Sequence, residues 1–600
     1  MRKAFTLAIL LLLLFGYGAF AGGGEEEIVD IEGGQSGQFD GLVDVSHDGD
    51  WELGRRGGRF ILSTTNDPKT FNNIVADETS TTDITERLVG AVVRRNQFTL
   101  EWEPWLAESW VITDDQKTIT FTLRSGLKWS DGTALTAHDF VDAVNEVYYN
   151  EEIVGASSTR NALRNAGGDS VWVAQSNTVF SVTLPSVYAG MFQLCSVAPL
   201  PMHIFRPLIQ SQGAGAVDSF WGVDADVTQI LSSGPWVVAE YVPSQYIRLS
   251  ANPYYYEKDA DGTQLPYLDE IVFRIYPDQD TQLQAFIAGD IDYLNLRGED
   301  VGALVSRKAE LGFELYNVGP SASTNFITFN QNPIEGDDDA GIAPPQLTWL
   351  SNLTFRHAIS HLIDRQTIIN NIVFGFGYPQ FSFVPSFSPY YWDEAPAHGL
   401  TYDPVLAADL LDSIDYIDRD GDGWREDPDG NPIALTLQTN SDNSERVAII
   451  NQIAQEAQQV GLRITPQAVD FNALVGQLVA SYDWELVVIG LTGSLDPISG
   501  ANVFPSSGQL HMIEPNQTSP RREWEARVDE AWDVANLTVD EDQRKRGFQI
   551  IQEIWLEQAP WTFTYNRAVI EAYRSEFGNV YPHPVENYDW EGVLDRLYVK

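Results

Sequence analysis

The clearest pattern of hydrophobic and polar positions lies in the second half of the chain. Five segments alternate there between short apolar runs and runs with helical spacing of apolar residues. In chain order they are residues 433–438, 444–460, 462–464, 472–480 and 484–489. Gly461 ends the first helical run, as glycine commonly does just past a helix. The order strand, helix, strand, helix, strand predicts an α/β fold with a doubly wound, parallel sheet.

Strands and helices are also mixed in the first half of the chain. Residues 119–123 alternate apolar and polar side chains, which predicts a half-buried strand. A helix is expected to begin near Thr136. Three further strands are predicted from apolar runs, at residues 236–238, 246–249 and 271–275. The sequence contains no short tandem repeat, so a solenoid fold is not expected.

Two loops follow the carboxyl ends of the predicted parallel strands, at residues 439–443 and 490–512. Ligands of doubly wound sheets bind beyond those ends, and long ordered loops tend to be functional. The second loop combines hydrogen-bonding side chains with glycines that allow close backbone approach. Its candidate solute-contacting residues are Gly490, Thr492, Gly493, Ser494, Asp496 and Asn502.

Asn66 and Asp67 follow the first predicted strand and are candidates from the other part of the chain. For these two residues a plain Asx turn is the alternative interpretation. The same alternative holds for Asp496, because it directly precedes Pro497. The two interpretations of Asp496 predict different effects of replacing it by alanine. If Asp496 contacts the solute, the substitution weakens binding, and if it only forms the turn, the substitution lowers stability.

The start of the chain has the features of a secretion signal over residues 1–21. Arg2 and Lys3 precede a largely apolar run over residues 4–14, and residues 19–21 form an A-x-A cleavage site. Cleavage after Ala21 predicts a periplasmic, exported protein. Because no cysteine lies near the cleavage site, no lipid anchor on cysteine is expected. Residues 22–57, rich in glycine and acidic residues, are expected to form a flexible tether.

The charge of the chain excludes one large class of partners. With 37 basic and 85 acidic residues, the formal net charge is -48, so nucleic acid is not expected to bind. Such an acidic surface suits a saline medium, but it is equally compatible with an acidic exported protein in general. Cys195 is the single cysteine, so no disulfide can form within the chain.

Aromatic residues add two candidates for solute contact. The chain contains 17 tryptophans and 24 tyrosines, whose faces can stack on sugar rings and on peptide side chains. Trp105 and Trp392 are the candidates, the second because it ends an aromatic run in a proline-rich loop. Most tryptophans of a chain this size must belong to the core, which is the alternative for both.

An acidic, glycine-containing loop follows the helix expected near residues 404–411. Its spacing is that of an EF-hand-like calcium loop, with acids at positions 1, 3, 5 and 12 and glycine at position 6. The acids are Asp418, Asp420, Asp422 and Asp429, and the glycine is Gly423. A hairpin turn rich in Asp and Gly is the alternative. Calcium would be a structural ion here, and no other cofactor is expected.

No motif of catalysis accompanies these features. His357 and His361 lie one helical turn apart, but Ala358 occupies the place that a zinc protease fills with glutamate. No G-x-S-x-G motif and no phosphate-binding loop is found. A binding protein is therefore expected, and an exported hydrolase on a similar scaffold is the alternative from another class.

Several ordered segments resemble a known family of exported binding proteins. They are residues 106–110 (LAESW), 120–132 (TFTLRSGLKWSDG), 135–139 (LTAHD), 233–236 (SGPW), 252–255 (NPYY), 289–293 (GDIDY), 329–333 (FNQNP), 356–360 (RHAIS) and 364–365 (DR). Together they are similar to the extracytoplasmic solute-binding proteins of the peptide/nickel class, family 5 of the ABC-importer receptors. The resemblance covers about residues 58–600.

The resemblance implies a periplasmic-binding-protein type II-like fold, with two lobes joined by a hinge that close on a solute. Lobe I would comprise residues 58–320, with an inserted subdomain at about 96–230. Lobe II would comprise residues 323–562, and residues 563–600 would return to lobe I. The implied partners are a peptide or related small solute and an ABC permease in the membrane. A monomer is expected.

In dipeptide-binding relatives, the loop that matches residues 490–497 carries an aspartate shortly after a Thr-Gly pair. That carboxylate pairs with the free amine of the peptide. In this chain Ser494 follows Gly493, and the nearest acid, Asp496, matches a structural Asp-Pro further along the loop. The resemblance therefore leaves two solutes open, a peptide and an oligosaccharide, since some members of the superfamily carry sugars.

Overall fold

A computed structural model describes residues 41–44, 51–96, 101–334, 341–508, 510–515, 517, 519–582 and 594–600. In this structure, the strands among the alternating segments of the second half belong to one five-stranded sheet. The alternating elements are β16 (Ala434–Asn440), α14 (Ser444–Gln459), β17 (Arg463–Val469), α15 (Phe471–Gly476) and β18 (Leu486–Leu491). Strand β16 pairs in parallel with both β17 and β18, which confirms the predicted parallel, doubly wound arrangement.

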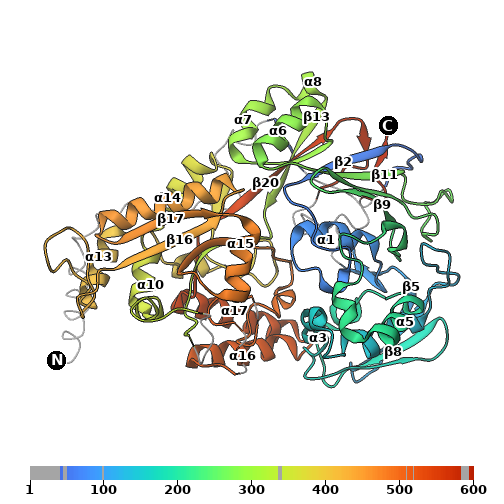
Figure 1. Cartoon of the computed structure of the whole chain (residues 1–600), viewed down its shortest axis with the longest axis horizontal. Coiled ribbons are helices and arrows are strands. Elements are labelled where there is room, and N and C mark those ends of the chain that lie inside the picture. Colours follow the sequence, from blue (N-terminus) through green and yellow to red (C-terminus); the bar gives the residue numbers. More distant parts are fainter. Residues whose placement is uncertain are drawn as a thin grey trace, which may run out of the picture. The chain divides into compact units, whose positions relative to one another are not determined.

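Two antiparallel strands complete this sheet, in the order β17-β16-β18-β14-β19. They are β14 (Thr324–Phe329) and β19 (Trp561–Phe563). Immediately after β19, strand β20 (Tyr565–Arg574) joins a different sheet, where it pairs with β13 (Phe313–Pro320). The chain therefore passes directly from one of these sheets to the other between β13 and β14 and between β19 and β20. Strands β13 and β20 are labelled in Figure 1.

The first half contributes two four-stranded sheets. One has the order β2-β11-β10-β9, and the other has the order β5-β6-β8-β7. Their strands are β2 (Arg59–Thr64), β11 (Glu270–Ile275), β10 (Tyr246–Ala251), β9 (Trp236–Val242), β5 (Ala107–Ile112), β6 (Thr118–Leu123), β8 (Val179–Thr183) and β7 (Val171–Ala174). The second of these sheets lies wholly within the stretch predicted as an inserted subdomain, and the boundaries of the lobes stay predictions.

Three of the remaining strands, β1 (Val43–Asp44), β12 (Tyr293–Leu296) and β15 (Gly377–Pro379), belong to the sheet of β13 and β20, and the other elements lie outside the large sheets. The other strands are β3 (Val93–Arg95), β4 (Trp102–Pro104), β21 (Phe577–Gly578) and β22 (Tyr598–Val599). The helices are α1 (Thr79–Thr85), α2 (Ala137–Asp142), α3 (Ser157–Leu163), α4 (Met191–Cys195), α5 (Met202–Gln212), α6 (Gln279–Ala288), α7 (Gly298–Val305), α8 (Lys308–Leu311), α9 (Gln346–Ser351), α10 (Leu353–Ser360), α11 (Arg365–Thr367), α12 (Ala395–His398), α13 (Pro404–Ser413), α16 (Glu523–Asn536) and α17 (Glu541–Gln558).

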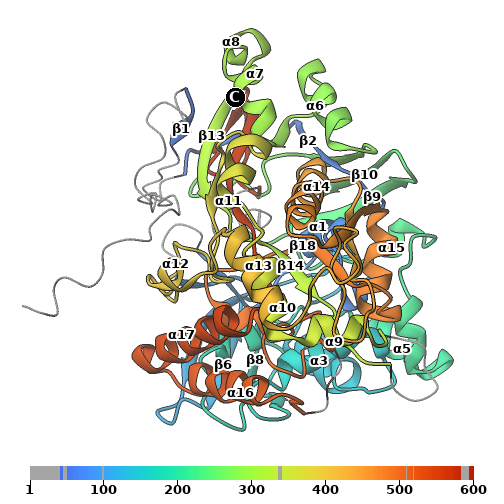
Figure 2. The same cartoon turned by 90° about the vertical axis from the view of Figure 1, so that its left-hand side faces the viewer.

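Local sequence signals explain where the main helices begin and end. The Asn443 side chain accepts a hydrogen bond from the Arg446 backbone N–H and so caps α14. Gly461 follows that helix with a φ of 77°, a left-handed conformation that favours glycine. Asp540 caps α17 in the same way as Asn443 caps α14. Helices α16 and α17 then pack side by side, as Figures 1 and 2 both show.

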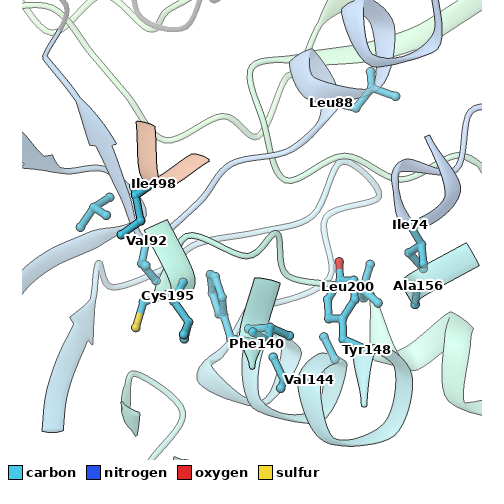
Figure 3. Packing of buried hydrophobic residues seen from close by; sticks show 14 of the residues in the cluster. Ile74, Leu88, Val92, Phe140, Val144, Tyr148, Ala156, Cys195, Leu200 and Ile498 are labelled. Carbon is cyan, nitrogen blue, oxygen red and sulfur yellow. The ribbon is translucent and has the colours of Figure 1, made fainter. Parts of the chain in front are cut away.

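Two hydrophobic clusters hold these elements together. The first joins side chains from the first-half sheets to α16, α17 and the loop after β18. The second packs α10, α13 and α14 against β14, β16 and β18. Cys195 lies buried in the first cluster as a free thiol (Figure 3).

The start of the chain is only partly described. The predicted signal peptide, residues 1–21, lies outside the described residues, as does most of the predicted tether. Within the tether stretch, β1 pairs in parallel with β13, and the Glu52 backbone N–H donates to the Asn579 side chain at 2.9 Å. The described part of that stretch is therefore held by hydrogen bonds. Among the described residues, no helix combines the length and the hydrophobicity that spanning a membrane requires.

Candidate functional site

The loop that follows β18 approaches other backbone segments very closely. A Cβ atom at Gly490 would lie 2.7 Å from the Thr324 carbonyl oxygen. At Gly493, a Cβ atom would lie well under 3.0 Å from the Ala322 carbonyl oxygen. Both positions thus favour glycine, although the close neighbours are atoms of the protein itself, whereas the sequence-based expectation was a close approach to the solute. The close approach fixes the loop against the segment that leads into β14.

This loop forms one wall of a cleft with a volume of about 410 Å³. The other walls come from residues far away in the sequence, so the two halves of the chain meet at the cleft. Its polar and aromatic lining includes Asn73, Glu86, Arg94, Arg95, Trp102, Trp105, Gln193, Ser196, Ser494, Asp496 and Ser499. Cavities of this size hold small solutes, and a few convergent polar groups fix their orientation.

Asp496 takes part in a buried ion pair at the edge of the cleft. Both of its carboxylate oxygens lie 2.9 Å from Nη2 of Arg544, on α17. The side chains of Asp496 and Arg544 are only 12% and 6% exposed. Burial disfavours the charge of Arg544, but the attraction and hydrogen bonds of Asp496, together with Tyr390 and Glu541, outweigh burial, and the pKa of Arg544 is raised. The negative charge of the Asp496 carboxylate is therefore largely balanced by Arg544 within the protein.

Asp496 also has the turn role that its position before proline suggests. Its Oδ1 accepts a hydrogen bond from the Ile498 backbone N–H at 3.2 Å and caps the 3₁₀ helix η9 (Pro497–Gly500). Both interpretations of this residue thus have structural support: it caps a turn, and it lines the cleft.

Arg95 reaches across the cleft toward the same carboxylate. Its Nη2 lies 3.9 Å from Oδ2 of Asp496. The Arg95 guanidinium also lies 4.8 Å from the centre of the Trp102 ring, and Phe192 stacks on Trp102 with a centroid distance of 5.5 Å. The Arg95–Asp496 contact joins the first-half wall of the cleft to the loop after β18.

Trp105 lines the cleft mainly as part of a buried network. The residue is 3% exposed, and its Nε1 donates to the Tyr255 hydroxyl at 2.9 Å. The Arg94 guanidinium lies 5.7 Å from the Trp105 ring centre and forms a bidentate pair with Glu257 at 3.0 and 3.2 Å. With its ring enclosed in this way, Trp105 offers a solute little aromatic surface.

Neighbouring groups in the same network, above all Glu257, keep Arg94 charged despite its burial. Burial disfavours the charged form of Arg94, but Glu257 and its neighbours outweigh burial and raise the Arg94 pKa well above its ordinary value. Asp595, which accepts from the Tyr255 hydroxyl at 3.3 Å, is fully enclosed. Burial, assisted by the charge of Glu257, raises the pKa of Asp595 to about 7. Behind Arg94 and Trp105, the network therefore combines the Arg94–Glu257 ion pair with a carboxyl, that of Asp595, whose pKa lies near neutrality.

An apolar contact joins the two halves of the chain beside the cleft. Ile498, from η9, is 3% exposed and belongs to the first hydrophobic cluster, which contains residues of both halves. Figure 3 shows it beside Val92 and close to Cys195. Nearby, the Ala189 backbone N–H donates to the Asn536 carbonyl at 2.8 Å. Packing and hydrogen bonding thus join the two halves of the chain next to the polar lining.

Three of the predicted solute-contacting residues meet at the cleft: Trp105, Ser494 and Asp496. The other seven are not among its lining residues. Asn66 donates locally to the Thr65 hydroxyl, and Asp67 accepts from the Tyr241 hydroxyl and the Ser244 backbone N–H, each at 2.8 Å. Asn66 therefore interacts locally, whereas Asp67 is held by the distant β9–β10 connection, and neither side chain makes the hydrogen bond of an Asx turn.

The remaining five residues have other surroundings. Trp392 stacks on His398 with a centroid distance of 4.9 Å. Thr492 and Asn502 are exposed, and Gly490 and Gly493 position the loop without lining the cleft.

Several lining residues were not predicted. The doublet Arg94-Arg95, followed by Trp102, is the sequence signal that could have indicated them, since basic residues are scarce in this chain. Glu86, Gln193, Ser196 and Ser499 carry no such signal, because they are common polar residues that only the fold brings together.

The acidic loop between α13 and β16 brings four carboxylates together. Oxygens of Asp418, Asp420, Asp422 and Glu426 all lie within 4.8 Å of one another. Asp429, the predicted ligand at position 12, is not in this group, and Glu426, at position 9, is in it. Hard cations such as calcium prefer several oxygen ligands at such spacing. These four side chains could hold one.

Comparison with known proteins places the chain among binding proteins. The family model "Bacterial extracellular solute-binding proteins, family 5 Middle" matches residues 101–510. A protein of Deinococcus radiodurans named "Probable ABC transporter-binding protein" is 30% identical over 78% of this chain and 79% of its own length.

Two solved structures share the fold. The oligopeptide-binding protein AppA of Bacillus subtilis, in complex with a nonapeptide, is 21% identical with a TM-score of 0.75, over 91% of this chain and 100% of that one. The periplasmic binding protein MelB of Agrobacterium fabrum, in complex with stachyose, is 19% identical with a TM-score of 0.78, over 92% and 86%. The expected periplasmic-binding-protein type II-like α/β fold is thereby confirmed.

The relatives are binding proteins, so the expectation that the chain is not an enzyme is confirmed as well. The matched region includes residues of both walls of the cleft, from Trp102 to Ser499, whereas the lining residues between Asn73 and Arg95 precede it. The chain belongs to the bacterial extracellular solute-binding proteins of family 5.

Proposed function

We propose that this protein is the capture component of an ABC importer, which binds a peptide or related small solute and delivers it to a permease in the membrane. The observation that carries this proposal is the cleft, whose polar walls come from the first half of the chain and from residues 494–499. A solute that contacts both walls would favour the form in which they are close together.

Two solute classes fit the cleft. AppA was solved with a nonapeptide and MelB with stachyose. A peptide is the first candidate, because charged side chains of the first-half wall, such as Glu86 and Arg95, can pair with its ends and side chains. An oligosaccharide is the second candidate, because Arg544 already neutralises Asp496 and leaves that carboxylate poorly suited to a peptide amine.

Filling the cleft with a bulky side chain should abolish binding. Ser499 lines the cleft and is exposed, so the substitution Ser499→Trp is expected to be accommodated by the fold while it occupies the solute volume. Isothermal titration calorimetry against peptide pools and against cello- and xylo-oligosaccharides measures this directly. We expect binding of one class by the native protein, and at least a hundredfold weaker binding by the variant.

The matched control is Ser413→Trp, at the exposed end of α13 and outside the cleft. It should bind as the native protein does. Small-angle scattering adds a second readout: the native protein should become more compact with saturating solute, and Ser499→Trp should not. Equal affinities of the two variants would contradict the proposal.

We further propose that the protein is exported as a monomer, with a mature chain that starts at Gly22 and carries no lipid. The A-x-A site and the lack of a nearby cysteine motivate this proposal. Native mass spectrometry of protein from the producing cells should show the mass of residues 22–600 alone. A retained signal peptide, an added acyl mass or a stable dimer would contradict it.

Calcium is proposed as a structural ion of the acidic loop. Binding only to the folded state raises stability by mass action. The melting temperature should therefore be higher in calcium than in chelator, by roughly 2 °C or more. Asp420→Asn should remove this difference, whereas Asp409→Asn, an exposed acid on α13, should keep it. Equal melting temperatures of the native protein in both buffers would leave only the hairpin turn.

A further inference from the structure

A buried hydrogen-bond network lies directly behind the first-half wall of the cleft. At its centre is the hydroxyl of Tyr255, which meets three other side chains. Nε1 of Trp105 donates to it at 2.9 Å, Oε2 of Glu257 lies 3.0 Å from it, and Oδ2 of Asp595 lies 3.3 Å from it. Trp105 lines the cleft, and so does Arg94, the ion-pair partner of Glu257. A rearrangement of this network therefore acts on a wall that faces the solute.

The hydroxyl of Tyr255 cannot serve both carboxylates at once. A phenol carries one proton, so it donates either to Glu257 or to Asp595, and the other carboxylate then lacks this donor. A proton on Asp595 removes the conflict, because the direction of its hydrogen bond reverses. The carboxyl of Asp595 then donates to the Tyr255 oxygen, and the Tyr255 O–H donates to Glu257. Together with the N–H of Trp105, each of the three contacts then has a proton of its own.

The charges around Asp595 favour the same proton. Among the described residues, the ionisable groups on the elements around it are Glu257, Tyr255, Arg94 and Arg596, and Tyr267, which packs on Tyr255 and directs its hydroxyl to Asp259. Glu257 accepts from Arg94 at 3.0 and 3.2 Å and from Arg596 at 2.9 Å. Glu103 accepts from Nε of Arg94 at 2.7 Å. Two cations are thus balanced by two carboxylates while Asp595 is neutral. Because Asp595 is 3% exposed, its ionisation would leave a buried negative charge in excess.

The pKa of Asp595 agrees with this geometry. Burial, assisted by the charge of Glu257, raises the pKa of this carboxyl from 3.8 to about 7. A carboxyl with a raised pKa stabilises the folded state fully at a pH below the pKa of the unfolded chain, about 4. The stabilisation is lost as the pH rises from about 4 to about 7. The network therefore changes its charge close to neutral pH.

We propose that Asp595 holds a proton that it shares with Glu257 through the Tyr255 hydroxyl. This proton positions Trp105 and Arg94 in the wall of the cleft. When it leaves, the single O–H of Tyr255 must be divided between two carboxylates, and the excess negative charge acts on the Arg94 guanidinium.

Glu257, Tyr255 and Asp595 are positioning residues, because none of them lines the cleft. A solute should bind more weakly above neutral pH, since a wall that has more than one arrangement must be ordered on binding. Only this effect on affinity rests on the function proposed for the cleft.

The indole N–H resonance of Trp105 tests the proposal without any solute. Protein labelled with nitrogen-15 at its tryptophans is titrated by NMR between about pH 5.5 and about pH 8.5, and Trp105→Phe assigns the resonance. We expect the resonance to shift with a midpoint of about pH 7. In Asp595→Asn this dependence should vanish, because the amide stays neutral and can still donate to Tyr255.

The matched control is Asp261→Asn. Asp261 is an exposed acid in the β10–β11 connection, where Tyr255 and Glu257 also lie, and the variant should titrate as the native protein does. If Asp595→Asn does not fold, Tyr255→Phe takes its place. It interrupts the path between Asp595 and Trp105, so the Trp105 resonance should again lose its pH dependence.

Calorimetry with the solute found for the native protein measures the consequence for binding. The affinity of the native protein should fall about threefold to tenfold from about pH 6 to about pH 8.5. Asp595→Asn should bind at both pH values as the native protein does at the lower one. If no solute binds at either pH, the cleft proposal fails, and the resonance still decides on the proton.

A Trp105 resonance that does not shift over this range, or that titrates equally in Asp595→Asn, would overturn the shared proton. Equal solute affinity of the native protein at both pH values, alongside a titrating resonance, would show that the proton does not position the wall for binding.

Discussion

Replacing Asp496 by alanine is expected to lower the free energy of unfolding by about 3–5 kcal/mol, because it leaves Arg544 buried without its main partner. The guanidinium of Arg544 is 6% exposed and is held by both oxygens of Asp496 at 2.9 Å. Glu541 remains 3.3 Å away but is 62% exposed, so it replaces only part of the interaction. The loss should therefore lie toward the lower end of this range. Urea-induced unfolding measures it.

A capping aspartate without a buried partner provides the control. Asp226 caps a short helix through the Thr228 backbone N–H and hydroxyl, as Asp496 caps η9, but it is exposed. Asp226→Ala should therefore destabilise the protein clearly less than Asp496→Ala. The double variant Asp496→Ala/Arg544→Leu should recover much of the loss, because no buried charge remains unpaired. Equal effects of the two alanine variants would show that only the turn matters.

This expectation differs from what the sequence alone suggests for a solute-contacting carboxylate, which is weaker binding with little change in stability. The reason is non-local. Arg544 lies 48 positions after Asp496 along the chain, and nothing in either segment indicates that the two meet. The Asp-Pro pattern did predict the turn, because an Asx turn depends only on residues within two positions of the aspartate.

The same division between local and distant interactions explains what else could be predicted. The parallel sheet of β16, β17 and β18 follows from apolar periodicity and from end signals such as Gly461, which are local. The lining of the cleft depends on how distant strands and loops are placed. Arg95 and Asp496, for example, approach to 3.9 Å although about four hundred positions separate them. Sequence patterns therefore located the loop after β18, but of the first-half wall they indicated only Trp105.

Trp105 and the acidic loop show two further limits. A tryptophan beside the cleft was expected to offer its ring to a solute, but the Tyr255 hydroxyl and Arg94 enclose it. The EF-hand spacing predicted an acid at position 12. In this chain the hairpin between Ile417 and Glu426, which form an isolated β-bridge, brings the acid at position 9 into the group instead. Both differences arise from the backbone path, which residue spacing does not determine.

Replacing Gly493 by alanine should reduce solute affinity at least tenfold, because it pushes the loop after β18 away from the cleft. The added Cβ would lie well under 3.0 Å from the Ala322 carbonyl oxygen, so one of the two segments must move. The segment around Ala322 is held in place: Nδ2 of Asn566 donates to the carbonyl oxygens of Ser321 and Ser323 at 2.9 and 3.0 Å. The loop should therefore yield, and Ser494 and Asp496 would move with it. Overpacking of this kind also destabilises a protein by about 1–3 kcal/mol.

Calorimetry with the solute found for the native protein measures the affinity, and thermal unfolding measures the stability. The matched control is Gly302→Ala in α7, where an added Cβ meets no heavy atom within 4 Å. In an exposed helical position, alanine is favoured over glycine by about 1 kcal/mol, so this variant should be as stable as the native protein or more stable, with the same affinity. If Gly493→Ala lowers the melting temperature but leaves the affinity unchanged, the loop supports the fold without binding the solute, and the walls of the first half must hold the solute on their own.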